Sequence, residues 1–268
     1  LKNVSLQSIS MKPPQILVGT GQSVGMQREH NEDTLFAFTS ILADGSNDLP
    51  VGVFVVADGM GGHQSGEVAS NAAARAISGH LLKSLYLPYL VAQENSGSSL
   101  LELMEEGVKA AQQAVTRKAP GGGTTLSAAL LFGDQITIAH VGDSRVYFIY
   151  PDGRMQIITQ DHSLVHRLVE LGQITEQEAM VHPQKNVLYR AVGQAEPYKP
   201  DINTYQLPRP GFVLMCSDGL WGVVAEQEIF RIVKGAANPS AACHQLIQAA
   251  NNAGGPDNIS AVLIQYLP

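Results

Sequence analysis

The segment VGVFVVADGMGGH, residues 51–63, joins an apolar run to an acidic, glycine-rich turn. Residues 51–57 are almost continuously apolar, which predicts a strand that is buried on both faces. Asp58 follows at the end of this strand, where a carboxylate is costly to bury unless something pairs with it. An isolated Asp-Gly pair such as Asp58-Gly59 is usually an ordinary turn. Its position directly after a buried strand favours a functional site here.

Three further aspartates lie in similar segments. They are Asp33 in REHNED (28–33), Asp218 in LMCSDG (214–219) and Asp257 in GPDNIS (255–260). Two unpaired carboxylates about 4 Å apart repel by about 4 kcal/mol at an effective dielectric of about 20, so gathering several of them requires cations. Oxygen ligands flanked by glycines suit Mn²⁺ or Mg²⁺. Two such ions can share a water and lower its pKa, so that hydroxide becomes available as a nucleophile.

Four other polar residues near these segments each leave two interpretations open. Arg28 is either a surface cation or, beside a metal cluster, a fork for two phosphate oxygens. Glu32 would face away from Asp33 in an extended segment, whereas in a loop both could reach metal-bound water. His63 is equally compatible with a solvated loop residue and with a donor of a proton to a leaving alkoxide. Asp143 is either a turn residue paired with Arg145 or a ligand for an additional, weaker cation.

The composition excludes several classes of protein. The chain has 268 residues, 44% of them hydrophobic, which is enough for one large core or at most two small domains. Its net charge is −7, and the absence of a Lys/Arg-rich run argues against a nucleic-acid partner. The two cysteines form no CxxC pair, which argues against a disulfide framework or a zinc ribbon. No apolar stretch reaches the ~18–20 residues of a membrane span, and no signal peptide is visible. We therefore expect a cytoplasmic protein that does not contact membranes. We also expect a monomer.

The order of predicted elements indicates an α+β fold. Strands are expected at 16–18, 34–38, 51–57, 125–132, 135–140, 145–150, 155–158, 212–217 and 260–266, and helices at 67–87, 98–118, 161–180, 226–233 and 240–252. This order is not the steady alternation of a doubly wound sheet. It predicts a single domain over residues 15–268, with stacked antiparallel sheets and helices outside, after an N-terminal tail at residues 1–14.

Local signals refine two of these helices. Ser98 or Ser99 is a suitable N-cap for the second helix, with Glu102 in the capping-box position. The sequence TEQE at residues 175–178 predicts another helix start. For His140 and His162 we favour structural hydrogen bonding over a role in catalysis.

Taken in chain order, these segments resemble the metal-dependent, PPM-type protein serine/threonine phosphatases in their bacterial form. The resemblance rests on Arg28, residues 31–33, 56–63, 66–67, 123–125, 141–145, 161–163, 216–220 and 257–260. Any one of these matches is weak, but the ordered set spans residues 16–267 and is specific.

The resemblance implies a four-layer α-β-β-α sandwich of two antiparallel sheets. It implies hydrolysis of phosphoserine and phosphothreonine on proteins by a hydroxide that bridges two Mn²⁺ or Mg²⁺ ions. The implied roles are a bridging ligand for Asp58, direct ligands for the Gly59 carbonyl, Asp218 and Asp257, water-holding for Glu32 and Asp33, phosphate binding for Arg28 and general acid for His63. Residues 163–186 correspond to the family's variable flap beside the cleft. The implied partners are phosphorylated proteins, in particular those of a bacterial serine/threonine kinase.

One position departs from the family pattern. Many relatives carry an aspartate four residues after the position of Asp218 that helps to bind a third cation, whereas this chain has Gly222. A third, weaker site is therefore left open, with Asp143 and Asp218 still available to it.

Two rival functions are compatible with parts of the sequence. A catalytically silent relative that only binds partners is disfavoured, because every core ligand is present. A different two-metal hydrolase, such as a phosphodiesterase, usually relies on His ligands, and among the histidines only His63 lies near an aspartate motif at a fitting spacing.

Overall fold

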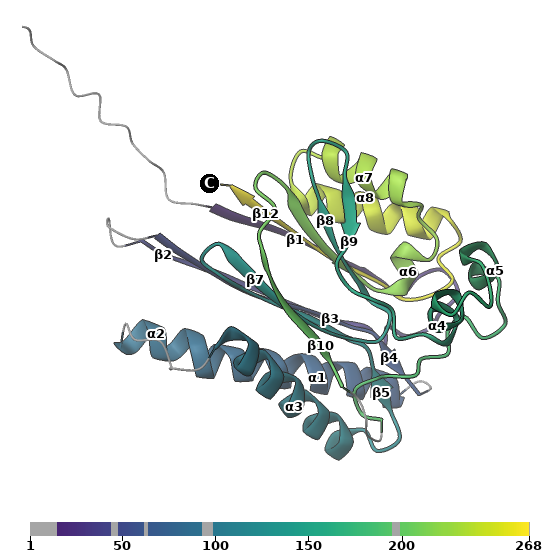
Figure 1. The fold of residues 1–268 in the computed structure, drawn as a ribbon, viewed down its shortest axis with the longest axis horizontal. Helices are drawn as coiled ribbons and strands as arrows, with labels where there is room; N and C mark the ends of the chain where they lie inside the picture. Colours follow the sequence, from purple (N-terminus) through teal and green to yellow (C-terminus); the bar gives the residue numbers. More distant parts are fainter. Residues whose placement is uncertain (1–14, 44–47, 62–63, 93–98, 195–198, 268) are drawn as a thin grey trace, which may run out of the picture.

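Within the residues that the computed structural model describes, two five-stranded antiparallel sheets stack on each other and helices cover their outer faces (Figure 1). The described residues are 15–43, 48–61, 64–92, 99–194 and 199–267. The predicted tail at residues 1–14 lies outside them, and so does His63. The arrangement is the predicted α+β fold with four layers.

The first sheet has the order β1-β12-β11-β8-β9 and the second has the order β10-β7-β6-β3-β2. The strands of the first are β1 (Gln15–Ser23), β12 (Ile259–Leu267), β11 (Phe212–Cys216), β8 (Arg145–Ile149) and β9 (Met155–Ile157). The strands of the second are β10 (Asp201–Gln206), β7 (Gln135–Val141), β6 (Leu126–Phe132), β3 (Asp48–Ala57) and β2 (Thr34–Ala43). A two-residue ladder joins β4 (Gly59–Met60) to β5 (Gly123–Thr124).

Helices cover both sheets from the outside (Figure 1). The second sheet is covered by α1 (Gln64–Leu81), the π-helical turn η1 (Leu82–Tyr86), α2 (Leu87–Ala92) and α3 (Leu100–Lys118), and the first by α6 (Asp218–Trp221), α7 (Glu226–Gly235) and α8 (Pro239–Asn252). Two short helices, α4 (Leu164–Glu170) and α5 (Glu176–Met180), lie at one end of the sandwich. Among the described helices, none has the length and apolar character needed to cross a bilayer.

Strand β3 shows why apolar side chains fill the space between the two sheets as well as the space between each sheet and its helices. Val53 and Val55 face α1 and α3, whereas Phe54 and Val56 face the other sheet, and all four are at most 1% exposed. Successive side chains of a strand point to opposite faces, so a run that is apolar at every position fits a strand covered on both sides. The prediction for residues 51–57 is therefore confirmed. The strand ends at the edge of this core, and Asp58 follows directly.

The two helix starts predicted from capping signals are confirmed. The Ser99 hydroxyl accepts a hydrogen bond from the Glu102 N–H, and the Glu102 carboxylate accepts one from the Ser99 N–H. Thr175 and Glu178 form the same reciprocal pair at the start of α5. The continuous helix expected at 161–180 is wrong, because the chain forms α4 and α5 with a turn between them.

The strand β10 was not predicted. Its sequence, DINTYQ, is mostly polar, and it pairs on one side only, with β7, at the edge of the second sheet. An edge strand with exposed side chains lacks the apolar pattern by which a strand is recognised in sequence.

His140 on β7 is a buried structural histidine, as predicted. Its Nε2 lies 3.1 Å from the Gln160 carbonyl oxygen and its Nδ1 lies 2.9 Å from the Ser127 hydroxyl. A carbonyl only accepts hydrogen bonds, so Nε2 carries the proton and Nδ1 accepts from the serine. Burial, with a smaller effect of His162, lowers the pKa of His140 to about 4.

This histidine predicts a pH dependence of stability. Because its pKa in the folded state lies below its ordinary value of about 6.5, the stability it contributes is complete above that pH and is lost as the pH falls towards 4. At about 1.4 kcal/mol per pKa unit, His140 should cost about 2 kcal/mol of unfolding free energy between pH 6.5 and 5. In urea unfolding at pH 7 and pH 5, His140→Gln should lose less stability than the native chain.

The control for this measurement is His244→Gln, which changes an exposed histidine on α8. It should follow the native pH dependence. If His140→Gln loses as much stability as the native chain on acidification, the buried neutral imidazole is not a source of the acid sensitivity.

Candidate active site

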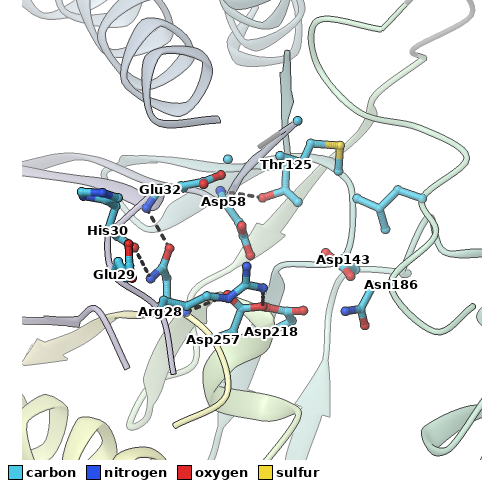
Figure 2. Close-up of a pocket in the computed structure, with 15 residues that line it drawn as sticks. Arg28, Glu29, His30, Glu32, Asp58, Thr125, Asp143, Asn186, Asp218 and Asp257 are labelled. Carbon is cyan, nitrogen blue, oxygen red and sulfur yellow. Dashed lines mark hydrogen bonds and ion pairs between the residues drawn. The ribbon is translucent and has the colours of Figure 1, made fainter. Parts of the chain in front are cut away.

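A pocket of ≈ 380 Å³ lies where loops of both sheets meet, and acidic side chains line it (Figure 2). Of the residues singled out in the sequence, its lining includes Arg28, Glu32, Asp58, Gly59, Asp143, Asp218 and Asp257. They come from five separate segments: the β1–β2 loop, the end of β3, the β7–β8 loop, the start of α6 and the loop before β12. The structure therefore brings together residues that lie up to 229 positions apart in the chain, as the Arg28–Asp257 contact shows.

The Asp58-Gly59 pair is built for close packing of backbones. The N–H of Asp58 donates to the Thr125 hydroxyl at 2.9 Å, and its carbonyl accepts from the Thr125 N–H at 2.8 Å. A Cβ on Gly59 would lie 2.3 Å from the carbonyl oxygen of Gly66. Glycine is thus required by the neighbouring helix, and the turn interpretation of this Asp-Gly pair is wrong.

The Asp218-Gly219 pair follows the same rule. A Cβ on Gly219 would lie 2.0 Å from the carbonyl oxygen of Asn258, so only glycine lets the start of α6 approach the loop that carries Asp257. Asn258 also fixes the β1–β2 loop, which carries Glu32. Its side-chain oxygen accepts a hydrogen bond from the Glu32 N–H at 2.7 Å. Its side-chain nitrogen donates to the carbonyl of His30 at 2.8 Å.

Asp33 is not among the lining residues and lies buried beside them. One carboxylate oxygen accepts a hydrogen bond from the Ser217 hydroxyl at 2.9 Å, and the other is buried without a hydrogen-bond partner among the described residues. Burial raises the pKa of Asp33 to about 7, the nearby Ser260 and Ser217 oppose this increase, and Asp218 adds to it.

The pKa values of the other carboxyl groups at the pocket are raised for the same reasons. Burial raises the pKa of Asp58 and of Asp143 well above the usual range, and neighbouring aspartates add to the effect. Burial and the charge of Asp257 raise the pKa of Asp218 to about 6. One oxygen of Asp218, like one of Asp33, is buried and has no hydrogen-bond partner within the described part of the chain. Hard divalent cations would satisfy such oxygens and cancel the repulsion, so the donor set fits Mn²⁺ or Mg²⁺.

The described side chains do not form a closed cation cage as they stand, because no group of three or more His, Cys, Asp or Glu among them is arranged to hold an ion. Asp257 is instead paired with Arg28, whose Nη2 lies 2.7 Å from its carboxylate. The Arg28 side chain is half exposed and lines the pocket. For Asp257 to serve as a ligand, this ion pair must loosen.

The loop that carries Asp143 resolves one of the open alternatives. Asp143 is 7% exposed, and Arg145 forms its ion pair with Asp161, Nη2 to oxygen 2.8 Å, so the pairing of Asp143 with Arg145 is wrong. The loop is held by His162, whose Nδ1 accepts from the Gly142 N–H at 3.1 Å. The structural role expected of His162 is thereby confirmed.

Residues 163–186, the segment expected to form a flap, include α4 and α5. Backbone hydrogen bonds between residues 162–164 and 187–189 close its base. Asn186 and Leu188 line the pocket, so the end of this segment borders the acidic residues.

Sequence reasoning missed the residues that position the acids. Thr125, Ser217, Asn258 and Trp221 all bond to the segments that carry aspartates. The first three lie within the motifs quoted from the sequence, but their small polar side chains have no signal of their own. His63 lies outside the described residues.

Known proteins show clear similarity to this chain. Residues 18–259 match the family described as protein phosphatase 2C. The serine/threonine phosphatase stp of Listeria innocua is 38% identical over 246 residues, which cover 90% of this chain and 92% of the relative. The crystal structure of the Mycobacterium tuberculosis serine/threonine phosphatase PstP/Ppp has a TM-score of 0.76 at 30% identity and covers 93% of this chain and 98% of its own.

A second solved structure adds a ligand. The catalytic domain of PstP in complex with two manganese ions has a TM-score of 0.76 at 28% identity, over 95% of this chain and 100% of its own. The family match runs from β1 into β12 and includes every segment that lines the acidic pocket. The chain belongs to the protein phosphatase 2C family.

Proposed function

We propose that this member of the family hydrolyses phosphoserine and phosphothreonine esters on proteins with the help of two Mn²⁺ or Mg²⁺ ions. The observation that supports it is the convergence of Asp58, Asp218 and Asp257 on one pocket, with a buried carboxylate oxygen left unpartnered. When bound, two such ions supply charge neutralisation and a water activated for attack on phosphorus. No phosphoenzyme is expected, because the nucleophile comes from solvent.

The proposed metal-binding groups are the carboxylates of Asp58, Asp218 and Asp257 and the carbonyl of Gly59, with Asp58 shared between the ions. Glu32 and Asp33 would accept hydrogen bonds from water held at the site. Asp143 is proposed as the ligand of an additional, weaker cation, and the glycine at position 222 gives that site no carboxylate of its own.

Two residues act on the phosphate ester itself. Arg28 binds phosphate oxygens, for which its half-exposed side chain at the pocket is suited. His63 donates the proton that the leaving serine or threonine oxygen needs, an assignment that rests on the sequence motif. With no covalent intermediate to form, the rate comes from positioning and from fixed charge.

The partners follow from this chemistry. The substrates are phosphoproteins, which we expect to be made by a bacterial serine/threonine kinase. We propose a monomer in the cytoplasm, where such a kinase would place its phosphate groups. We also propose that residues 15–268 act as a single catalytic domain with a flap at 163–186, which the family match over residues 18–259 supports.

The substrate class is tested by comparing esters. Phosphoserine and phosphothreonine peptides and para-nitrophenyl phosphate should be hydrolysed with Mn²⁺ and not with excess EDTA. Bis(para-nitrophenyl) phosphate, a diester, should be hydrolysed at least about 100-fold more slowly, since its phosphorus carries a second ester in place of a free oxygen that Arg28 could bind. Preference for the diester would indicate a phosphodiesterase, and no turnover of any ester would indicate a silent binding module.

Asp58→Asn tests the shared ligand. Loss of this charge should lower activity by about 1,000-fold, since metal ions supply several kcal/mol of transition-state stabilisation. It should also abolish the rise in melting temperature that Mn²⁺ causes in the native chain. Asp152→Asn makes the same chemical change at an exposed Asp-Gly hairpin turn and serves as the control. A native-like Mn²⁺ shift in Asp58→Asn would contradict the assignment.

Arg28→Ala separates phosphate binding from metal binding. It should raise KM for a phosphopeptide by about 10-fold, the value of one hydrogen bond between charged groups. It should not weaken the response to Mn²⁺, because removal of Arg28 frees Asp257 from its ion pair. Arg154→Ala removes an exposed arginine that is also paired with an aspartate and should change neither quantity. A weaker Mn²⁺ response in Arg28→Ala would assign the arginine to the metal site instead.

A further inference from the structure

The single tryptophan of the chain connects two of the acidic segments. Trp221 is the last residue of α6, the helix that Asp218 begins. Its indole Nε1–H donates to the backbone carbonyl of Asp143 at 3.0 Å. One side chain thus links the loop of Asp143 to the helix of Asp218, across a pocket in which the two carboxylates repel each other.

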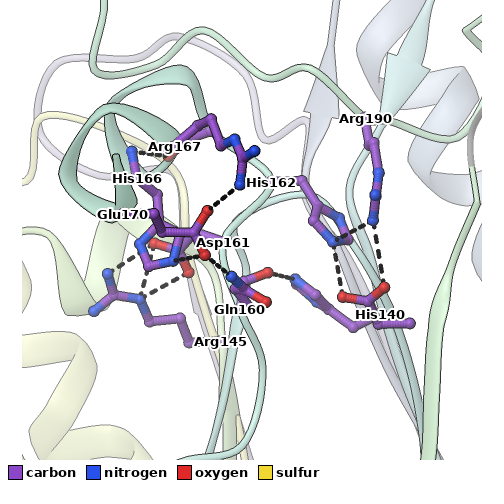
Figure 3. A network of polar contacts seen from close by, with 11 residues as sticks. His140, Arg145, Gln160, Asp161, His162, His166, Arg167, Glu170 and Arg190 are labelled. Carbon is purple, nitrogen blue, oxygen red and sulfur yellow. Dashed lines mark hydrogen bonds and ion pairs between the residues drawn. The ribbon is translucent and has the colours of Figure 1, made fainter. Parts of the chain in front are cut away.

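The indole is itself fixed by Arg145. The guanidinium carbon of Arg145 lies 3.6 Å from the centroid of the Trp221 ring, in a stacked cation–π contact. Its Nε and Nη2 donate to the carboxylate of Asp161, with distances of 2.8–3.2 Å. Figure 3 shows this pair in a wider polar network with His140, His162 and Arg190. A tilt or withdrawal of the ring would break its stacked contact with Arg145, whose guanidinium is held in place by a largely buried ion pair.

The Asp143 loop is held from its other end as well. The hydroxyl of Ser144 lies 2.7 Å from that of Thr125, and the Thr125 oxygen accepts from the Asp58 N–H. Two contacts thus tie the loop to the strand end of Asp58 on one side and to the helix of Asp218 on the other. The contact through Trp221 is the one that a minimal chemical change can remove, because it depends on a single N–H.

We propose that Trp221 is a positioning residue, which sets the Asp143 carboxylate relative to Asp218 through its indole N–H and is held in place by the stacked Arg145. Trp221 acts through the Asp143 carbonyl and contacts neither the reacting ester nor its phosphate. The inference rests on the proposed function in one respect only: the acidic pocket must bind divalent cations.

The first test removes the hydrogen-bond donor of Trp221. Because the chain has one tryptophan, expression in a tryptophan auxotroph with benzothienylalanine replaces only the Trp221 N–H by sulfur and keeps the ring shape. Loss of a hydrogen bond worth about 1 kcal/mol should raise the Mn²⁺ concentration for half-maximal activity by about five-fold. KM for a phosphopeptide at saturating Mn²⁺ should stay within two-fold.

The coupling to Asp143 is tested by a double change. In Asp143→Asn, the sulfur replacement should have less than a two-fold further effect on the Mn²⁺ requirement, because both changes act on one loop. An equal five-fold effect in both backgrounds, or none in the native background, would overturn the proposal. Arg145→Lys should shift the requirement in the same direction, and Arg154→Lys, at an exposed arginine stacked on Tyr150, is its matched control.

The second test uses the metal alone and needs no turnover. With 5-fluorotryptophan the chain gives one ¹⁹F resonance, and titration with Mg²⁺ should shift it in the native chain and not in Asp143→Asn. A shift that persists unchanged in Asp143→Asn would contradict the proposed link. If ¹⁹F reports Mg²⁺ binding while no phosphopeptide is hydrolysed, the proposed function fails and the positioning role stands.

Discussion

The burial of several carboxylates at one place, with their mutual repulsion added to it, is the constraint on which the rest of the structure depends. Asp33 and Asp143 are each 7% exposed, Asp58 and Asp218 are partly buried in the pocket wall, and burial is the largest cause of the raised pKa of each. Without a compensating charge, folding must either protonate these groups or hold them as anions at a high energetic cost. A pair of divalent cations removes both difficulties. The pocket therefore has an electrostatic demand that the proposed metal ions would meet.

Close packing of backbones holds the acidic residues together in this pocket. Gly59 and Gly219 follow their aspartates in a conformation open to any residue, and each is glycine because a neighbouring carbonyl oxygen occupies the place of a Cβ. The close approach brings α1 against β4 and α6 against the Asn258 loop. Asn258 then bonds to the backbone of the β1–β2 loop, so that both sheets hold one site. Larger residues at the two glycines would move the carboxylates apart even if every acid were retained.

Much of this was predictable from the sequence, and the failures have physical reasons. The apolar run 51–57 and the capping pair at Ser99 carry strong local signals, and the ordered acidic motifs predicted the lining of the pocket. The edge strand β10 has a polar pattern that resembles a loop. The pairing of Arg145 with Asp161, and of Arg28 with Asp257, depends on contacts between distant segments that no local pattern encodes.

The Arg28–Asp257 ion pair shows how one contact can connect ligand binding to metal binding. The two groups are 2.7 Å apart, and the arginine is half exposed, so exchange of its partner exposes little new surface. A guanidinium has one planar fork, which can serve either a carboxylate or a phosphate. A cation bound by Asp257, as proposed, would compete with Arg28 for that carboxylate, and an arginine released from Asp257 would have its fork free for phosphate oxygens. Under the proposed function the two ligands would therefore favour each other, because a cation that takes up Asp257 frees Arg28 and a phosphate that takes up Arg28 frees Asp257.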